Sequence, residues 1–109
     1  MNADYSERMN QLGRRARAAG RALAKSSGAA RDAALEAMAA GLVASRARIL
    51  EANALDLAAA DEEGMATAMR DRLELSAERI DAMATALREI AAQPDPVGEV
   101  LGERVRPNG

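Results

Sequence analysis

The sequence predicts an all-α protein. Apolar residues recur at spacings of three and four through most of the first 92 residues, which is the period of one helix face and not of a strand. Three of these stretches begin at a serine, whose hydroxyl can accept a hydrogen bond from a backbone amide of the first helical turn: Ser27, Ser45 and Ser76. We therefore expect about four amphipathic helices, followed by an extended tail.

The first predicted helix covers residues 4–25. Its apolar stripe consists of Tyr5, Met9, Leu12, Ala16, Ala19 and Leu23. Its outer face is basic, with Arg8, Arg14, Arg15, Arg17, Arg21 and Lys25. A solvated surface explains this charge more simply than a site for nucleic acid or an acidic partner, since aromatic residues that could stack on bases do not accompany the arginines.

Charge is divided unevenly along the chain. Residues 1–31 carry seven basic and two acidic side chains, a balance of +5, whereas residues 32–109 carry eight basic and fifteen acidic ones, a balance of −7. The two balances add to the net charge of −2. The two parts are therefore expected to attract each other or a partner of opposite charge.

Two further helices are predicted over residues 28–43 and 46–63. Their inner faces are expected to comprise Leu35, Met38, Ala39 and Leu42 in the first helix, and Ile49, Leu50, Ala52, Leu57 and Ala60 in the second. Gly64 is predicted to be the C-cap of the second, because glycine adopts the left-handed conformation that ends many helices. Residues 65–72 are expected to form a short helix.

The last predicted helix covers residues 76–92. Ser76 is its expected N-cap, and one stripe comprises Ile80, Met83, Ala84, Leu87, Ile90 and Ala91. Pro94 and Pro96 end the helix, because proline lacks the amide that a helix interior requires. Residues 94–109 then form a turn and an extended tail, which closes on the turn signal Pro-Asn-Gly.

The core available to these helices is small. Leu, Ile and Val contribute 18 of 109 residues, with six Met, one Tyr and no Phe or Trp. Such a chain buries little apolar area, so the free energy gained by burial offsets little of the conformational entropy lost on folding. We expect broad thermal unfolding of the isolated chain, and Leu and Met side chains exposed on a surface meant for a further domain.

No residue is assigned a catalytic, cofactor-binding or metal-binding role. The chain has no cysteine and no histidine, which removes a thiolate nucleophile, the commonest general base and the commonest metal ligand. The acidic run Asp61–Glu63 is read as a solvated helix end, because consecutive carboxylates on a helix point in different directions. No run of about 18 apolar residues could span a membrane, so the expected compartment is the cytoplasm.

Several short stretches, in this order and spacing, resemble the N-terminal region of the glutamate-5-semialdehyde dehydrogenases, also called gamma-glutamyl phosphate reductases, in the aldehyde dehydrogenase superfamily. The resemblance extends from about residue 20 to the end. The stretches are ILEANALDL at residues 49–57, Asp71-Arg72-Leu73 with Leu75, Arg79-Ile80, DPVGEV at residues 95–100 and RPNG at residues 106–109.

This resemblance implies a longer enzyme that reduces gamma-glutamyl phosphate with NADPH in proline biosynthesis and that uses a catalytic cysteine. It implies that residues 1–93 are a helical segment packed on the cofactor-binding domain and that residues 94–109 lead into further strands. Asn53, Asp56, Asp71 and Arg72 are then structural residues. No catalytic or cofactor residue carries over to this chain, so we expect it to have no activity and no NADPH affinity when alone.

The sequence is also compatible with two other classes of function. One is a free-standing helical interaction module, whose helicity would depend on concentration. The other is a basic-helix nucleic-acid binder, whose affinity would fall steeply with salt. Assembly into a homo-oligomer is compatible with each reading.

Overall fold

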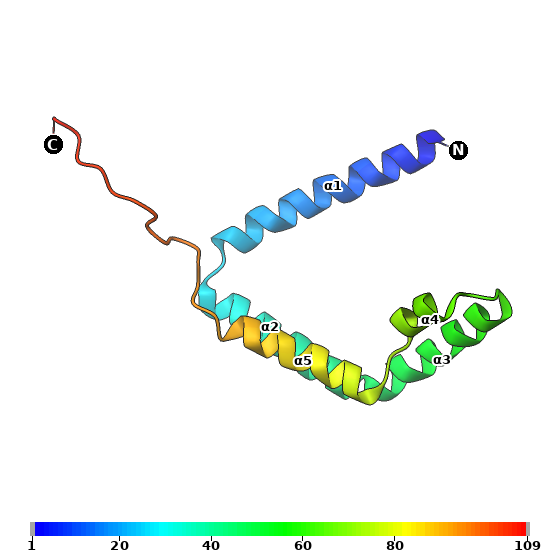
Figure 1. The fold of residues 1–109 in the computed structure, drawn as a ribbon. Coiled ribbons are helices and arrows are strands. Elements are labelled where there is room, and N and C mark those ends of the chain that lie inside the picture. The colour runs from blue at the N-terminus through cyan, green and yellow to red at the C-terminus, as the bar shows by residue number, and fades with distance from the viewer. Residues whose placement is uncertain (1, 109) are drawn as a thin grey trace. The chain divides into compact units, whose positions relative to one another are not determined.

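The computed structural model describes residues 2–108, and in this range the chain forms five α-helices and no strand (Figure 1). The helices are α1 (Asn2–Lys25), α2 (Gly28–Ala44), α3 (Arg46–Glu62), α4 (Thr67–Leu73) and α5 (Ala77–Ala91). The prediction of an all-α chain with four long helices is confirmed, and the expected short helix is α4.

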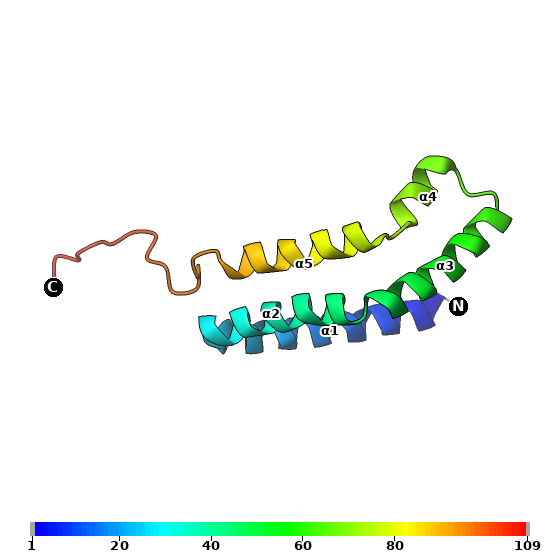
Figure 2. The ribbon, with the colours of Figure 1, turned by 90° about the horizontal axis from the view of Figure 1, so that it is seen from below.

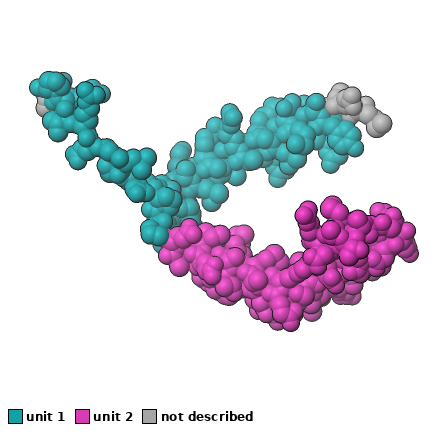
Figure 3. Space-filling model, viewed as in Figure 1, with its two compact units in different colours: residues 1–31, 94–109 teal, residues 32–93 magenta. Residues whose placement is uncertain are grey.

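The chain divides into two compact units (Figure 3). Unit 1 consists of residues 1–31 and 94–109 and therefore holds α1, the start of α2 and the tail. Unit 2 is the continuous segment 32–93, which holds the remainder of α2 and all of α3, α4 and α5.

Two of the three predicted serine caps are present. The Ser27 Oγ accepts a hydrogen bond from the Ala30 amide, and the Ser76 Oγ accepts one from the Arg79 amide, each at 3.1 Å. Both bonds reach the third residue after the cap, which satisfies an amide that has no partner inside its own helix. These caps set the starts of α2 and α5.

The prediction that Ser45 is the third cap is wrong, because its side chain makes no capping hydrogen bond. Its backbone has φ −96° and ψ 7°, whereas a helix cap needs an extended conformation. The Ser45 amide donates to the Gly41 carbonyl at 2.9 Å, and the Ile49 amide donates to the Ser45 carbonyl at 3.0 Å. Helical hydrogen bonds thus continue through the junction of α2 and α3, and few amides there need a side-chain acceptor.

The predicted stop at Gly64 is confirmed. Gly64 has φ +72°, a value that costs glycine little and other residues more. Its amide donates to the Asp61 carbonyl at 3.2 Å, and the Met65 amide donates to the Ala60 carbonyl at 3.0 Å. These are the two hydrogen bonds of a Schellman motif, so the last carbonyls of α3 are satisfied within the backbone.

In unit 2, α5 runs along α2 in the opposite direction and begins beside the start of α3 (Figures 1 and 2). Ion pairs mark this antiparallel arrangement, with Arg88 Nε 3.3 Å from Glu36 Oε2 near one end of α5 and Arg46 paired with Asp81 near the other. The chain thus reverses direction between α3 and α5, through α4.

The core of unit 2 is small. The buried apolar residues are Ala39, Ala60, Ile80 and Ala84, and of these only Ile80 has a large side chain. Two residues predicted on the inner faces, Met38 and Ala52, are exposed. The α5 stripe is also only partly covered, because Met83 and Ile90 remain 40% and 50% exposed. The apolar stripes are therefore wider than the surfaces that cover them within unit 2.

In unit 1, Arg31 joins the end of α1 to the tail. Its guanidinium donates to the Leu23 carbonyl at 3.1 Å, to the Ser26 carbonyl, and to both carboxylate oxygens of Asp95 at 2.8 Å each. The Val97 amide also donates to Asp95, at 3.0 Å. This backbone bond, followed by the contact with Arg31, holds the pKa of the Asp95 carboxyl below its ordinary range.

The Asp95 carboxylate lies close to the first residue of α2. A Cβ added at Gly28 would lie 2.6 Å from Asp95 Oδ2, closer than real side chains approach. Glycine is therefore the residue that lets the tail meet α2 here. Beyond this contact the described residues 99–108 are exposed and form neither helix nor strand.

Candidate packing surface

The apolar stripe of α1 is open to solvent in unit 1. Its large side chains are about 55–65% exposed: Tyr5 64%, Met9 65%, Leu12 55% and Leu23 56%. The basic residues on the outer face of α1 are exposed as well. A helix that presents both an apolar stripe and charged edges is suited to packing on another surface.

Unit 2 has a shallow apolar groove of about 380 Å³ formed by α2, α3 and α5. The residues that line it are Met38, Gly41, Leu42, Ser45, Ile49 and Leu87. A Cβ at Gly41 would meet no other atom within 4 Å, so the groove floor is open at this position. The groove lacks charged lining residues, which favours apolar packing over catalysis or ion binding.

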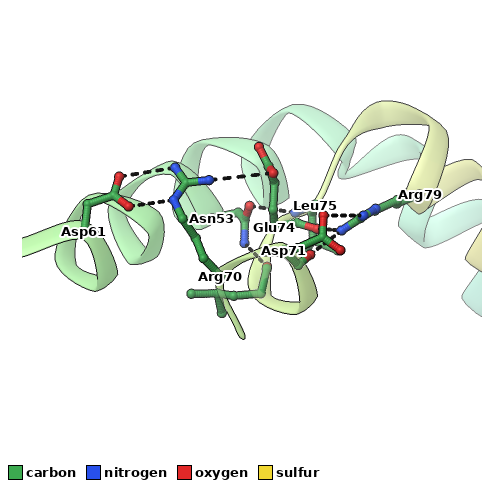
Figure 4. Close-up of polar contacts among 8 residues, drawn as sticks. Asn53, Asp61, Arg70, Asp71, Glu74, Leu75 and Arg79 are labelled. Atoms are coloured by element: carbon green, nitrogen blue, oxygen red, sulfur yellow. Dashed lines mark hydrogen bonds and ion pairs between the residues drawn. The ribbon is translucent and has the colours of Figure 1, made fainter. Parts of the chain in front are cut away.

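Asn53 is the buried polar residue of unit 2, with 7% of its surface exposed. Its Nδ2 donates to the Leu73 carbonyl and its Oδ1 accepts from the Leu75 amide, both at 2.9 Å (Figure 4). One side chain of α3 thus satisfies both backbone groups of the connection between α4 and α5. The resemblance implies a structural role for Asn53, and these two bonds join α3 to the connection between α4 and α5.

Arg70 of α4 holds the C-terminal end of α3 (Figure 4). Its Nε lies 2.6 Å from Asp61 Oδ1, and its Nη2 lies 3.2 Å from Asp61 Oδ2. Its Nη1 also lies 3.7 Å from Glu74 Oε2. Asp61 is therefore an ion-pair partner, not the simply solvated helix end that its place in the acidic run suggested. Sequence pattern missed this pair because it depends on how α4 folds back on α3.

Arg79 plays the same role between α4 and α5. It donates hydrogen bonds to the carbonyls of Asp71 and Glu74 and to the Asp71 carboxylate (Figure 4). A cation at these carbonyls interacts favourably with the negative end of α4. Of the other residues that the resemblance named as structural, Asp56 and Arg72 are exposed.

Stability at low pH should depend on the pair of Asp61 and Arg70. The hydrogen bonds from Arg70 hold the pKa of the Asp61 carboxyl below its ordinary range. A depressed carboxyl pKa stabilises the fold above the unfolded value of about 3.9, and this contribution is lost as pH falls through the folded pKa. We expect Arg70→Gln to raise the Asp61 titration midpoint, measured by carboxyl carbon chemical shifts. An unchanged midpoint would show that the pair does not form in solution.

Between residues 2 and 108 no group of three His, Cys, Asp or Glu side chains is placed to hold a metal ion. Over the same range, no helix combines the length and apolar character that crossing a membrane requires.

Comparison with known proteins identifies the relatives of this chain. It is 48% identical over 109 residues to a gamma-glutamyl phosphate reductase of Brucella suis biovar 1, a match that covers 100% of this chain. It is 55% identical over 93 residues, 85% of the chain, to that of Xanthomonas campestris pv. campestris, and 54% identical over 101 residues, 93% of the chain, to that of Rhodospirillum rubrum. This chain is a relative of the gamma-glutamyl phosphate reductases.

The matched region is a minor part of each reductase. The chain spans 26% of the length of the Brucella protein, 22% of the Xanthomonas protein and 24% of the Rhodospirillum protein. No protein-family model and no solved structure matches it. Over the residues that it describes, the structure shows helices with uncovered apolar faces, held in shape by arginine and asparagine contacts.

Proposed function

We propose that this chain forms the N-terminal helical part of an NADPH-dependent gamma-glutamyl phosphate reductase of the aldehyde dehydrogenase superfamily. The observation that carries the proposal is 48% identity to a curated reductase over all 109 residues. The whole enzyme would reduce gamma-glutamyl phosphate to glutamate 5-semialdehyde, with release of phosphate and NADP, in cytoplasmic proline biosynthesis.

In this proposal residues 1–93 pack on the cofactor-binding domain, and residues 94–109 lead into its strands. The open groove of unit 2 and the exposed stripe of α1 support it, because each is an apolar face without a cover in its own unit. The role of the chain is then to complete the packing around the cofactor domain, while the reacting groups lie elsewhere in the enzyme.

The chemistry itself needs groups that this chain does not contain. A nucleophile has to hold the acyl carbon while hydride is delivered from the nicotinamide, and the cysteine that the resemblance implies has no counterpart in a sequence without cysteine. The free-standing interaction module and the nucleic-acid binder are not favoured, since the similarity extends along the whole chain and is not confined to one helix.

A chimera tests the proposal. The 101-residue region of the Rhodospirillum reductase that this chain matches is replaced by the corresponding residues of this chain. We expect NADPH-dependent reductase activity in the chimera, compared with the parent enzyme and with a deletion of the same region. A soluble, cooperatively melting chimera without activity would contradict the proposal.

The isolated chain should not bind the cofactor. Titration of NADPH into the purified 109-residue protein, followed by nicotinamide fluorescence, is expected to show no saturable change. The parent reductase is the positive control for the same titration. Saturable binding by the chain would mean that its helices carry cofactor contacts that we assign to the remainder of the enzyme.

A further inference from the structure

We propose that the α1 stripe docks on an apolar surface that carries carboxylates opposite Arg8 and Arg15, and that the remaining part of the reductase polypeptide supplies this surface. This inference rests on the proposed function and adds to it the chemistry of the partner.

The stripe has the geometry of a helix-packing seam. Tyr5, Met9, Leu12, Ala16, Ala19 and Leu23 follow one another at steps of four, three, four, three and four residues. The steps alternate around the 3.6 residues of one helical turn, which keeps these residues on one line along α1, about 36 Å long at about 1.5 Å per residue. With its large members more than half exposed, this line is a surface that a partner helix or sheet could cover.

Arg8 and Arg15 border the stripe directly. Together with Gln11 and Leu12 they line a hollow of about 220 Å³ on the surface of α1. At 100° per residue, Arg14 and Arg21 instead lie on the opposite side of the helix. A partner that covers Leu12 therefore removes water from Arg8 and Arg15 while Arg14 and Arg21 stay solvated.

A desolvated guanidinium needs a partner of opposite charge. Burying an unpaired charge at an interface costs more free energy than the surrounding contacts contribute. A carboxylate within hydrogen-bond distance of the guanidinium offsets this cost. The surface that covers the stripe should thus carry Asp or Glu at two points spaced like Arg8 and Arg15, which are seven residues, or about two turns, apart.

A second copy of α1 does not meet this requirement. The positions that border the stripe on its other side are Ser6, Gly13 and Gly20, which carry no charge. A parallel pair of α1 helices would therefore set Arg8 and Arg15 against these residues, and an antiparallel pair would bring the arginine edges together. Neither arrangement supplies the carboxylates.

Nucleic acid also fits less well than an acidic protein surface. Phosphates would pair with the arginines, Arg14 and Arg21 on the far side included, and would leave the apolar stripe in water. A surface that combines apolar side chains with carboxylates satisfies both features of α1. The part of the relatives that this chain does not span, about three quarters of their length, is large enough to provide it.

The test uses the Rhodospirillum chimera described above and two matched double variants. Arg8→Glu with Arg15→Glu reverses the charges beside the stripe, and Arg14→Glu with Arg21→Glu reverses two charges with the same spacing on the opposite side. Arg14 Nη2 lies 3.9 Å from Glu7 Oε1 in an exposed ion pair. The control variant therefore loses one ion pair within α1 that the first variant keeps. We expect the first variant to lower the thermal midpoint by about 5 °C or more relative to the second.

Equal midpoints for the two double variants would overturn the docking proposal, even in a fully active chimera. Sedimentation of the 109-residue chain as a dimer that Leu12→Ala disperses would overturn it as well, because a second copy would then cover the stripe. So would salt-dependent binding of a DNA duplex that both double variants weaken equally. A folded but inactive chimera would contradict only the proposed function, since the difference in midpoint still tests the docking. A chimera that does not fold would contradict both.

Discussion

Replacement of Ile80 by alanine is expected to remove most of the helical circular dichroism of residues 32–93 at room temperature. Ile80 is fully buried, and it is the one large side chain in a core otherwise built from alanines. Truncating a buried isoleucine costs about 2–5 kcal/mol, and the neighbouring alanines are too short to fill the cavity. Unit 2 has little other burial with which to offset this loss. Ellipticity at 222 nm against urea measures the effect.

The matched control is Ile90→Ala, the same substitution ten residues later on α5. Ile90 is 50% exposed, so its truncation in the isolated chain should cost less than about 1 kcal/mol. In the reductase chimera the cost should rise, because the outer face of α5 would there be covered. Equal losses for the two variants in the isolated chain would show that Ile80 is not the centre of the core.

Replacement of Asn53 by alanine is expected to release the connection between α4 and α5. The substitution leaves the Leu73 carbonyl and the Leu75 amide without the partner that Asn53 provides, at a cost of about 1–3 kcal/mol for each group that stays buried. Amide hydrogen exchange should become much faster at Leu75, and the urea midpoint of unit 2 should fall.

Asn10→Ala is the control for this substitution, since Asn10 is an exposed residue of α1. It should leave both the Leu75 exchange rate and the urea midpoint unchanged. Unchanged exchange at Leu75 in Asn53→Ala would mean that the two backbone bonds do not form in solution.

The helices were predictable because their signals are local. The three-four spacing and the hydroxyls of Ser27 and Ser76 depend only on residues within one or two turns, and so does the left-handed turn at Gly64. Ser45 carries the same sequence signal as the other two serines. It is not a cap because α2 continues its hydrogen bonding into α3, which the serine signal alone does not reveal.

The contacts that hold the candidate packing surface in shape could not be predicted in this way. The pairs of Arg31 with Asp95 and of Asn53 with Leu75 join residues far apart in sequence, and no periodicity marks them. The stripe of α5 identified both Ile80 and Ile90 as inward-facing. Only the structure shows that Ile80 is buried and Ile90 half-exposed, because burial depends on how much of the neighbouring helices lies opposite each side chain.

The contact between Arg31 and Asp95 bears on the order in which the chain folds. Asp61 and Arg70 are 9 residues apart and Asn53 and Leu75 are 22 apart, whereas Arg31 and Asp95 are 64 apart. The entropy lost on closing a loop grows with its length, so the nearer contacts form at lower cost. Pairing of Glu36 with Arg88 brings the two ends of residues 32–93 together. It thereby shortens the loop that still has to close before Arg31 can meet Asp95. Residues 32–93 can therefore assemble first, and the bond between Arg31 and Asp95 closes last.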